Sequence, residues 1–354
     1  MSKRYRYGII GTGIPGGEEG ATGFGMSHFH YHGFMETGRV DVVAIADIRD
    51  DHALLFREKY KLRSKYYHDY HKMLETENLD IVSITTWPHL HAEMAIAACE
   101  AGVKAVHCEK PMASTWGDAL RIKAAADANG TILTFNHQRR FLVPFHAAKR
   151  IIDAGEIGDL TSIEATCGDL TDWGTHWLDM MFYFNNEVPA AWVIGQIHNT
   201  EERRTFGALT EQQAICHFAF QNGVRATLIT GDNATIGGPA IRVIGTLGAI
   251  DILWEKPWIR YRTKGDPDWR YIESEESIHG NCAIDRACAD LVAALDTPGY
   301  RPLLTVDHAI QHTEVIFATF ESSRRRGRVD LPLDKYDSAL ITMTEQNWIG
   351  PNAN

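Results

Sequence analysis

The sequence has few of the features that mark a disulfide-stabilised, membrane-bound or nucleic-acid-binding protein. Its six cysteines form no Cys-x-x-Cys pair and no zinc spacing, which is typical of reduced cytoplasmic thiols. No apolar run is long enough to span a bilayer, and the basic start leads into a short strand pattern rather than a signal-peptide core. The net charge of -11 argues against nucleic acid or an anionic membrane as a partner. We therefore expect a cytoplasmic globular protein without such partners.

Metal-ligand patterns are also absent from the sequence. The chain has 17 histidines, but its closest groups have no carboxylate at a familiar ligand spacing. Those groups are His28, His30 and His32, and then His89 and His91. We expect no metal site.

The beginning of the chain has the pattern of a dinucleotide-binding fold. An apolar-leaning strand pattern at residues 5–10 leads directly into Gly11, Thr12 and Gly13. Residues 14–23 are rich in glycine and show no helical stripe, so we interpret them as an insertion of about ten residues in the phosphate loop. The first helix is then expected to begin near Gly25 and to end before Gly38.

The position of an acidic residue supports this register. The fingerprint places an acid about 20 residues after its glycines, at the end of the second strand. Asp47 ends the strand pattern at 40–46, and it lies 22 residues after Gly25 but 31 after Gly16. A carboxylate there would bind the adenosine ribose hydroxyls and repel a 2′-phosphate, which favours NAD. Arg49 lies nearby, so NADP stays an alternative cofactor. The alternative role of Asp47 is to cap the next helix.

Regular alternation of strands and helices continues to residue 135. Strand patterns at 80–85 and 103–107 end beside Thr86 and beside Glu109 and Lys110, respectively. In an open α/β sheet, ligands bind outside the carboxyl ends of strands, so these residues and Asp47 are expected to meet at one crevice. We expect a Rossmann domain over residues 1–135.

Residues 136–354 have a different pattern of helices and strands, and we interpret them as a second domain for substrate binding and oligomerisation. Helices are expected at 144–154, after Asp172, at 282–295 and at 306–325. Strand patterns separated by turn signals predict a large, open, mostly antiparallel sheet. They cover 160–167, 191–197, 213–220, 225–230, 240–245, 249–254 and 258–261. The fold class is therefore α/β, with a Rossmann domain followed by an α+β domain.

The stretch 172–179 places three ionisable groups together. Asp172, His176 and Asp179 are spaced i, i+4 and i+7, which puts them on one face if the whole stretch is helical. Gly174 leaves room for close approach of another group, such as a ligand. Burying such groups is costly unless they pair or take part in chemistry. The alternative is a helix cap at Asp172, a core histidine and a structural Asp179.

Taken together, the motifs resemble those of the glucose-fructose oxidoreductase, inositol dehydrogenase and MocA family. The resemblance spans nearly the whole chain, and the insertion at 14–23 is its main departure. The matching motifs are Gly-Ile-Ile-Gly-Thr-Gly (8–13), Ala-Asp (46–47), Pro-His-Leu-His-Ala (88–92), Glu-Lys-Pro (109–111), Asp-Trp-Gly-Thr-His-Trp-Leu-Asp (172–179) and Gly-Thr-Leu-Gly (245–248).

This resemblance implies nicotinamide-dependent hydride transfer at a carbon of a sugar, inositol or related polyol. It also implies a dimer or tetramer formed through the outer face of the second sheet, and a cis Lys110–Pro111 bond. Residues expected to bind the cofactor are Gly11, Thr12, Gly13, Gly25, Asp47, Arg49, Thr86, His91, Glu109 and Lys110.

For the chemistry, we expect His176 to act as the base, since an imidazole titrates near neutral pH. Asp172 would orient its ring or relay the proton, and Lys110 would stabilise the developing alkoxide. Asp179, Arg140 and Trp173 or Trp177 are the expected substrate contacts, although the two tryptophans and Asp179 also suit structural roles.

Two other functions remain open from the sequence. One is an NAD-assisted glycosidase on the same fold, which oxidises C3, eliminates the aglycone and returns the hydride. The other is a non-enzymatic regulator that senses NAD. A proton-transfer set such as Lys110, Asp172 and His176 counts against a sensor.

Overall fold

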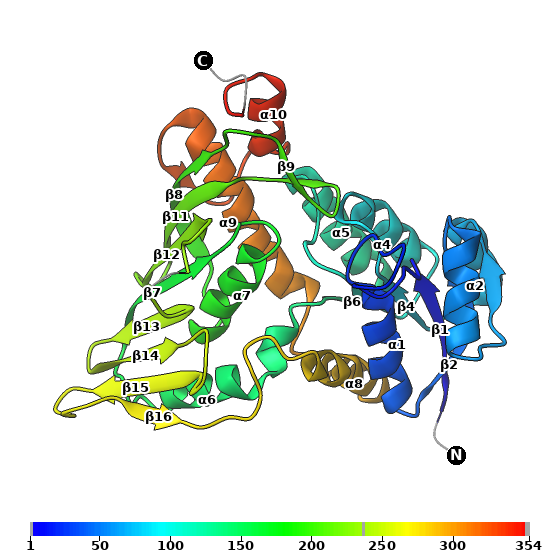
Figure 1. The fold of residues 1–354 in the computed structure, drawn as a ribbon, viewed down its shortest axis with the longest axis horizontal. Helices are drawn as coiled ribbons and strands as arrows, with labels where there is room; N and C mark the ends of the chain where they lie inside the picture. Colours follow the sequence, from blue (N-terminus) through cyan, green and yellow to red (C-terminus); the bar gives the residue numbers. More distant parts are fainter. Residues whose placement is uncertain (1–2, 236–237, 351–354) are drawn as a thin grey trace.

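The computed structural model describes residues 3–235 and 238–350, which form two main sheets with helices packed against them (Figure 1). The extreme ends of the two expected domains, at residues 1–2 and 351–354, lie outside the described residues. No helix in the described ranges is both long and apolar enough to cross a membrane. The six cysteines are unpaired, and five of them are buried.

The first sheet is parallel and has the strand order β3-β2-β1-β4-β5-β6. This is the order of a dinucleotide-binding fold. β4 and β5 are buried along their whole length, because helices cover both faces of a parallel sheet. The elements are β1 (Tyr5–Ile10), α1 (Met26–Glu36), β2 (Val40–Ala46), α2 (Asp50–Lys59), β3 (Lys65–Tyr67), α3 (Tyr70–Glu77), β4 (Ile81–Ile84), the short 3₁₀ helix η1 (Pro88–Leu90), α4 (His91–Glu100), β5 (Ala105–Cys108), α5 (Trp116–Asn129) and β6 (Ile132–Phe135).

The second sheet has nine strands in the order β16-β15-β14-β13-β7-β12-β11-β8-β17, and its pairs are antiparallel except for β7 with β12. α7 and α9 pack on one face of this sheet (Figure 1). The elements are η2 (Gln138–Phe141), α6 (Val143–Asp153), β7 (Leu160–Cys167), α7 (Gly174–Phe184), β8 (Ala190–His198), β9 (Arg203–Thr205), β10 (Ala208–Thr210), β11 (Gln213–Phe220), β12 (Arg225–Gly231), β13 (Ile241–Gly245), β14 (Gly248–Ile252), β15 (Ile259–Thr263), β16 (Arg270–Ile272), α8 (Cys282–Asp296), α9 (Val306–Arg325), β17 (Val329–Asp330) and α10 (Ala339–Glu345).

The predicted fold class is confirmed, and the longer elements lie within a few residues of their expected positions. The sequence did not predict β9, β10, β16, β17 or α10. Each of these strands has two or three residues, and α10 has seven. Elements this short carry too few residues for a periodic pattern.

One helix of the second half completes the first domain. α8 packs against α1, and the two appear side by side in Figure 1. Its apolar residues Ile284, Cys288, Leu291 and Val292 belong to the same buried cluster as residues of β1, β2 and α2. The last strand of the first sheet ends at residue 135. The helix layer on one side of that sheet, however, includes residues 282–296.

Candidate active site

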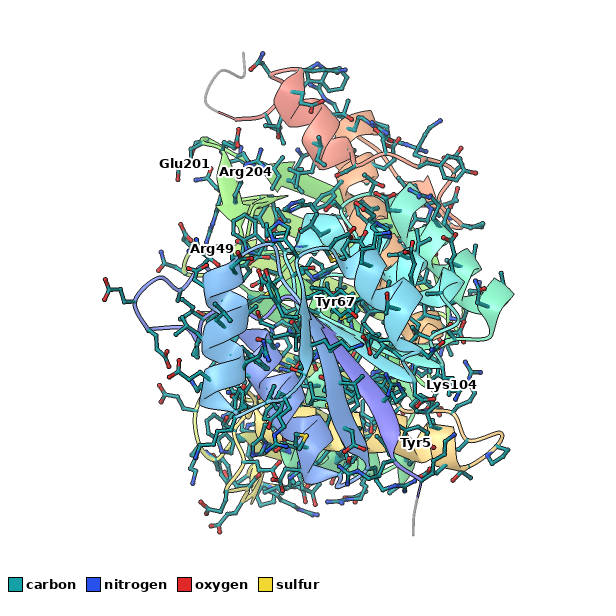
Figure 2. All side chains as sticks on the ribbon, turned by 90° about the vertical axis from the view of Figure 1, so that its right-hand side faces the viewer. Tyr5, Arg49, Tyr67, Lys104, Glu201 and Arg204 are labelled. Atoms are coloured by element: carbon teal, nitrogen blue, oxygen red, sulfur yellow. The ribbon has the colours of Figure 1, made fainter. Side chains whose placement is uncertain are left out.

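A cavity of about 1400 Å³ lies between the two sheets. The carboxyl ends of β1, β2, β4 and β5 form one wall, and η2, the turn before α7 and the tip of the β9–β10 hairpin form the other. Figure 2 shows the direction of the parallel strands: Tyr5 marks the start of β1, and Arg49 lies toward the opposite end of the sheet. The crevice expected from the sequence is therefore present as one continuous space.

The phosphate loop adopts the register counted from Gly25. Gly25 has a φ of 65°, α1 begins at the next residue, and no side chain caps this helix end. A Cβ at Gly25 would lie 2.7 Å from the Cα of Pro15 and 2.8 Å from the carbonyl oxygen of Ile14, so only glycine fits. The uncapped amides at this end of the cavity suit the pyrophosphate of a dinucleotide.

Asp47 faces the cavity at the end of β2, and its carboxylate is held by backbone amides. One oxygen accepts from the amide of Thr12 at 2.7 Å and from its hydroxyl at 2.9 Å, and the other accepts from the amide of Arg49 at 2.9 Å. Thr12 is buried and does not line the cavity, so it positions Asp47 instead of facing the cofactor space. The Arg49 side chain lines the cavity and pairs with Asp51.

His91 lies beneath the cavity wall and does not reach its surface. The side chain is completely buried, and its ring nitrogens contact the carbonyl oxygens of Pro111 at 2.8 Å and Thr86 at 3.1 Å. It therefore connects the segment after β4 with the segment after β5. This corrects the expectation that His91 contacts the cofactor, whereas Thr86 and Glu109 do line the cavity.

Glu109 is a buried carboxylate with fixed partners. One of its oxygens accepts from Nε2 of His30 at 2.8 Å and from the side-chain amide of Asn136 at 2.6 Å. Burial raises the pKa of this carboxyl, but the contacts with His30, Asn136 and nearby Lys110 outweigh burial and lower it to about 2. Glu109 is therefore an anion in the cavity wall.

Lys110 and Asp172 meet across the two domains. The ammonium group donates to the Asp172 carboxylate and, at 3.2 Å, to its backbone carbonyl oxygen. The Lys110–Pro111 bond is cis, as the resemblance implied. The contact joins the end of β5 to the turn before α7, so it requires both halves of the chain.

The segment 172–179 is only partly helical. α7 begins at Gly174, and Asp172 lies in the preceding turn, so the three ionisable residues do not share one helical face as expected. Asp169 caps this turn by accepting from the amides of Asp172 and Trp173 at 2.5 and 3.3 Å. A Cβ at Gly174 would lie 2.9 Å from the carbonyl oxygen of Asp169, so the glycine accommodates the capping turn and not a ligand.

His176 lines the cavity and is almost completely buried. Burial lowers the pKa of its imidazole well below 6.5, and the charges of Arg139 and Lys110 lower it further. Its Nδ1 is buried and has no hydrogen-bond partner within the described ranges, which leaves Nε2 for the cavity. No hydrogen bond joins Asp172 to His176 among the described residues, because the carboxylate faces Lys110. The expected orientation of the ring by Asp172 is therefore not seen.

Arg140 and Asp179 form a buried ion pair away from the cavity wall. Both carboxylate oxygens of Asp179 accept from Nε of Arg140, at 2.9 and 3.0 Å, and Nη2 donates at 2.7 Å. Arg140 also pairs with Glu187 at 2.6 Å. Neither residue of the pair lines the cavity. This corrects the expectation that they contact substrate, because the charge of each is already paired with that of the other.

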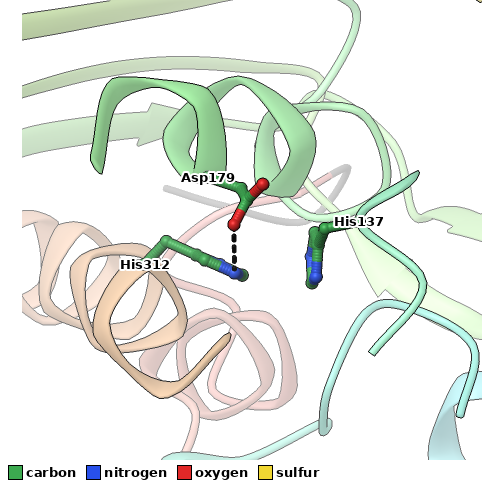
Figure 3. A group of neighbouring side chains, drawn as sticks. All are labelled: His137, Asp179 and His312. Carbon is green, nitrogen blue, oxygen red and sulfur yellow. Dashed lines mark ion pairs between the residues drawn. The ribbon is translucent and has the colours of Figure 1, made fainter. Parts of the chain in front are cut away.

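The same carboxylate belongs to a buried cluster that the sequence did not reveal. Figure 3 shows Asp179 beside His137 and His312, and the potential ligand atoms of all three lie within 4.8 Å of one another. Such a set resembles a metal site, although Arg140 already neutralises the carboxylate. The two imidazoles face the Thr175 hydroxyl, at 3.0 Å for His137 and 3.4 Å for His312. The cluster therefore supports α7 beneath His176.

At the substrate end of the cavity, one of the two expected tryptophans lines the wall, together with two residues that were not predicted. Trp173 lines it as expected, and its ring stacks on Trp254 with centroids 5.9 Å apart. Trp177 is fully buried instead, and its indole N–H donates to the carbonyl oxygen of Thr166. Arg139 and His279 complete this end of the cavity. From the sequence we expected Arg140 at the cavity, but the structure places its neighbour Arg139 there.

The β9–β10 hairpin of the second domain reaches the cofactor end of the cavity (Figure 1). Its tip residue Phe206 packs against Phe24, with ring centroids 5.3 Å apart. A Cβ at the neighbouring Gly207 would lie 2.8 Å from the Trp87 ring, so the hairpin approaches that ring closely. The residue that follows the insertion thus has a partner in the second half of the chain.

Comparisons with known proteins agree with this architecture. Residues 5–137 match the model of an oxidoreductase family with an NAD-binding Rossmann fold, and residues 167–251 match the GFO/IDH/MocA C-terminal domain. The chain is 35% identical to an inositol 2-dehydrogenase of Salmonella typhimurium over 152 residues, which are 43% of this chain and 42% of that protein. It is 27% identical to a myo-inositol 2-dehydrogenase of Thermotoga maritima over 286 residues, 75% of this chain and 81% of that protein.

Solved structures share the fold along nearly the whole chain. A levoglucosan dehydrogenase in complex with NADH and levoglucosan has a TM-score of 0.77 at 20% identity, covering 94% of this chain and 100% of the other. An oxidoreductase domain protein from Kribbella flavida has a TM-score of 0.78 at 21% identity, with the same coverage. With both domain models matched and in the expected order, this chain belongs to the GFO/IDH/MocA family of oxidoreductases, and its first domain is an NAD-binding Rossmann domain.

Proposed function

We propose that this protein is an NAD-dependent dehydrogenase that oxidises a secondary alcohol of a sugar, inositol or related polyol, or catalyses the reverse reduction. The main support is that Lys110, paired with Asp172, and a neutral His176 line the same cavity as the phosphate loop and Asp47. The curated relatives are named as inositol dehydrogenases, which agrees with an alcohol substrate.

NAD, when bound, supplies the hydride acceptor at its nicotinamide ring. The residues of the chain fit this cofactor, because a Cβ at Gly25 would close the phosphate loop and the adjacent helix end is uncapped. Gly11, Gly13 and Gly25 would border the pyrophosphate, and Asp47 would accept from the adenosine ribose. Arg49 stands close enough to Asp47 that NADP remains a second candidate.

The protein's contribution to the reaction is to hold and move a proton. His176 is neutral because burial disfavours its charged form, so Nε2 can accept the proton of the substrate hydroxyl. Lys110 is held by Asp172, and its ammonium group can donate a hydrogen bond to the oxygen that becomes negative. Asp172 thus acts on Lys110, while Trp173, which stacks on Trp254, provides an apolar wall for sugar carbons.

We also propose a reducing, cytoplasmic setting and self-association. All six cysteines are free and five are buried, which suits a reducing compartment. Isoleucine side chains lie exposed on the face of the second sheet opposite α7 and α9, and they suit an interface between copies of the chain.

Replacement of either proton-transfer group tests this function. We expect Lys110→Ala and His176→Ala each to lower kcat by at least about 100-fold, on the usual scale of acid-base catalysis. The measurement is NADH formation from a panel of sugars and polyols with NAD and with NADP. Lys72→Ala, at an exposed position on α3, is the matched control.

Three outcomes would contradict the proposal. Wild-type turnover in both variants would exclude these residues as catalytic groups. Release of an aglycone from glycosides without net NADH would instead identify the glycosidase reaction. NAD-dependent binding of a partner without any turnover would identify a sensor.

A further inference from the structure

Arg139 is a buried cation without a counter-ion in the wall of the cavity. It is only 6% exposed, and within residues 3–235 and 238–350 it forms no ion pair. Its neighbour Arg140 has the opposite arrangement, with two carboxylates as partners. An arginine buried in this way is unusual, because a desolvated charge is costly unless it is paired.

The hydrogen bonds of the Arg139 side chain are also incomplete. Nε and Nη1 are buried and have no acceptor in the described part of the chain, and Nη2 donates to Nδ1 of His279 at 3.1 Å. The guanidinium lies over the Trp177 ring, 4.0 Å from its centroid. This stacking fixes the group in place, but an aromatic ring does not neutralise it. Burial lowers the pKa of Arg139 to about 9, and the charges of Asp172 and Asp179 offset only part of this effect.

The carboxylates nearby are already engaged. Asp172 binds Lys110, and Asp169 caps the turn before α7. Glu109 is held by His30 and Asn136. The substrate end of the cavity, beside Trp173 and His176, therefore has one cation that the protein itself does not balance.

We propose that the substrate is a sugar acid, a uronate or an aldonate, whose carboxylate pairs with Arg139. This deepens the dehydrogenase function proposed above and rests on it. A neutral hydroxyl could accept a hydrogen bond from the guanidinium but would leave its charge unbalanced. Because Nδ1 of His279 accepts from Arg139, the ring hydrogen of a neutral His279 is on Nε2, which is a second donor for the carboxylate. Burial and the charge of Arg139 lower the pKa of His279 to about 4, so the ring is neutral near pH 7.

The site favours a carboxylate over a phosphate ester. A phosphate usually meets several cations or the free amides of a helix N-terminus. Among the residues that the structure describes, Arg139 is the one cation beside Trp173 that pairs with no carboxylate, and the amides of Asp172 and Trp173 before α7 are taken by Asp169. One planar guanidinium matches the single charge and planar shape of a carboxylate.

Matched substrate pairs test the proposal directly. We would compare kcat/KM with NAD for D-glucose against D-glucuronate and for D-galactose against D-galacturonate, with myo-inositol and D-glucose 6-phosphate as further arms. We expect the wild type to prefer the acid of each pair. Arg139→Leu, which keeps an apolar group over Trp177, should lower kcat/KM for the acid by about 10- to 100-fold more than for the neutral partner, mainly through KM.

Two further variants sharpen this test. Arg139→Lys keeps the charge but loses the planar fork, so it should retain part of the preference for the acid. Arg121→Leu removes an exposed arginine on α5, outside the cavity, and should behave as wild type. Thermal unfolding of each variant confirms that the fold persists.

Calorimetric titration of the cofactor-free protein with D-glucuronate and D-glucose separates this inference from the enzymatic function. Uronate binding that disappears in Arg139→Leu supports the carboxylate site even if no sugar is oxidised, which would contradict only the dehydrogenase. Oxidation of neutral polyols in preference to acids, with an equal effect of Arg139→Leu on both, would overturn the inference and leave the dehydrogenase standing. Preference for the phosphate ester over the uronate would overturn the carboxylate assignment.

Discussion

At the scale of single residues, the candidate site is defined by which cation pairs with which carboxylate. Lys110 pairs with Asp172, Arg140 pairs with Asp179, and Arg139 has no such partner in the described ranges. All three cations are largely buried, where water screens charges only weakly. The presence or absence of a carboxylate partner therefore decides the net charge around each cation. The sequence places Arg139 and Arg140 next to each other, but successive residues point in different directions. Only the packing of η2 shows which guanidinium reaches the cavity.

Asp47 allows a test of cofactor choice at this scale. Asp47→Asn removes the negative charge but keeps an acceptor for the Thr12 amide. We expect the preference for NAD over NADP, measured as the ratio of kcat/KM values, to fall at least about tenfold because the repulsion of a 2′-phosphate is lost. Glu75→Gln, at an exposed position on α3, is the control. An unchanged ratio would show that Asp47 does not face the ribose.

At the scale of elements, the outer face of the second sheet carries exposed apolar side chains. Ile194, Ile215 and Ile229 are 47%, 50% and 41% exposed on this face. Ile215 lies directly opposite Ile229 in the β11–β12 pair, while the other face of the sheet packs against α7 and α9. Adjacent exposed isoleucines on a sheet are typical of an interface.

A charge on this face should disrupt self-association. We expect the wild type to be a dimer or tetramer in light scattering, and Ile215→Asp to shift it toward the monomer, because a carboxylate is costly in a dry interface. Leu54→Asp introduces the same charge at an exposed position on α2 and should leave the mass unchanged. A monomeric wild type would refute the proposed oligomer.

Much of the element pattern was predictable, because the strands of the first sheet are short apolar runs between glycine or polar turns. The phosphate-loop register was also predictable from the distance between Gly25 and Asp47. The hairpin at 203–210 was not, since its strands have three residues each and its position depends on contacts with Phe24 and Trp87. The expected common face of Asp172, His176 and Asp179 is not formed, because helical spacing in a sequence does not reveal the turn that Asp169 caps before α7.

At the scale of the whole molecule, buried histidines link stability to pH. Burial lowers the pKa of His107 and of His137 to about 3, and lowers the pKa values of His176 and His312 well below 6.5. The unfolded chain therefore binds more protons than the folded protein below about pH 6.5, so acidification favours unfolding. Glu211 acts in the opposite direction, because burial and Asp169 raise its pKa to about 8.

We expect the free energy of unfolding to decrease between about pH 7 and pH 5.5. Each of the four histidines contributes a loss of roughly 1 kcal/mol per pH unit, and Glu211 offsets one to two of them, which leaves a net loss of a few kcal/mol. Urea unfolding at the two pH values measures this change. His107→Phe should make the pH dependence smaller, and a stability that is constant or rises on acidification would contradict the prediction.

The packing of α8 against α1 affects the order in which the protein becomes complete during synthesis. The sheet of the first domain is finished at residue 135, but the helix that covers Tyr7, Phe34 and their neighbours is not made until residue 296. Until then the growing chain has an apolar face open to water, where a chaperone or a wrong partner can bind. The cofactor domain therefore reaches its final form only after most of the second domain has been synthesised, and residues 1–135 alone would lack part of their core.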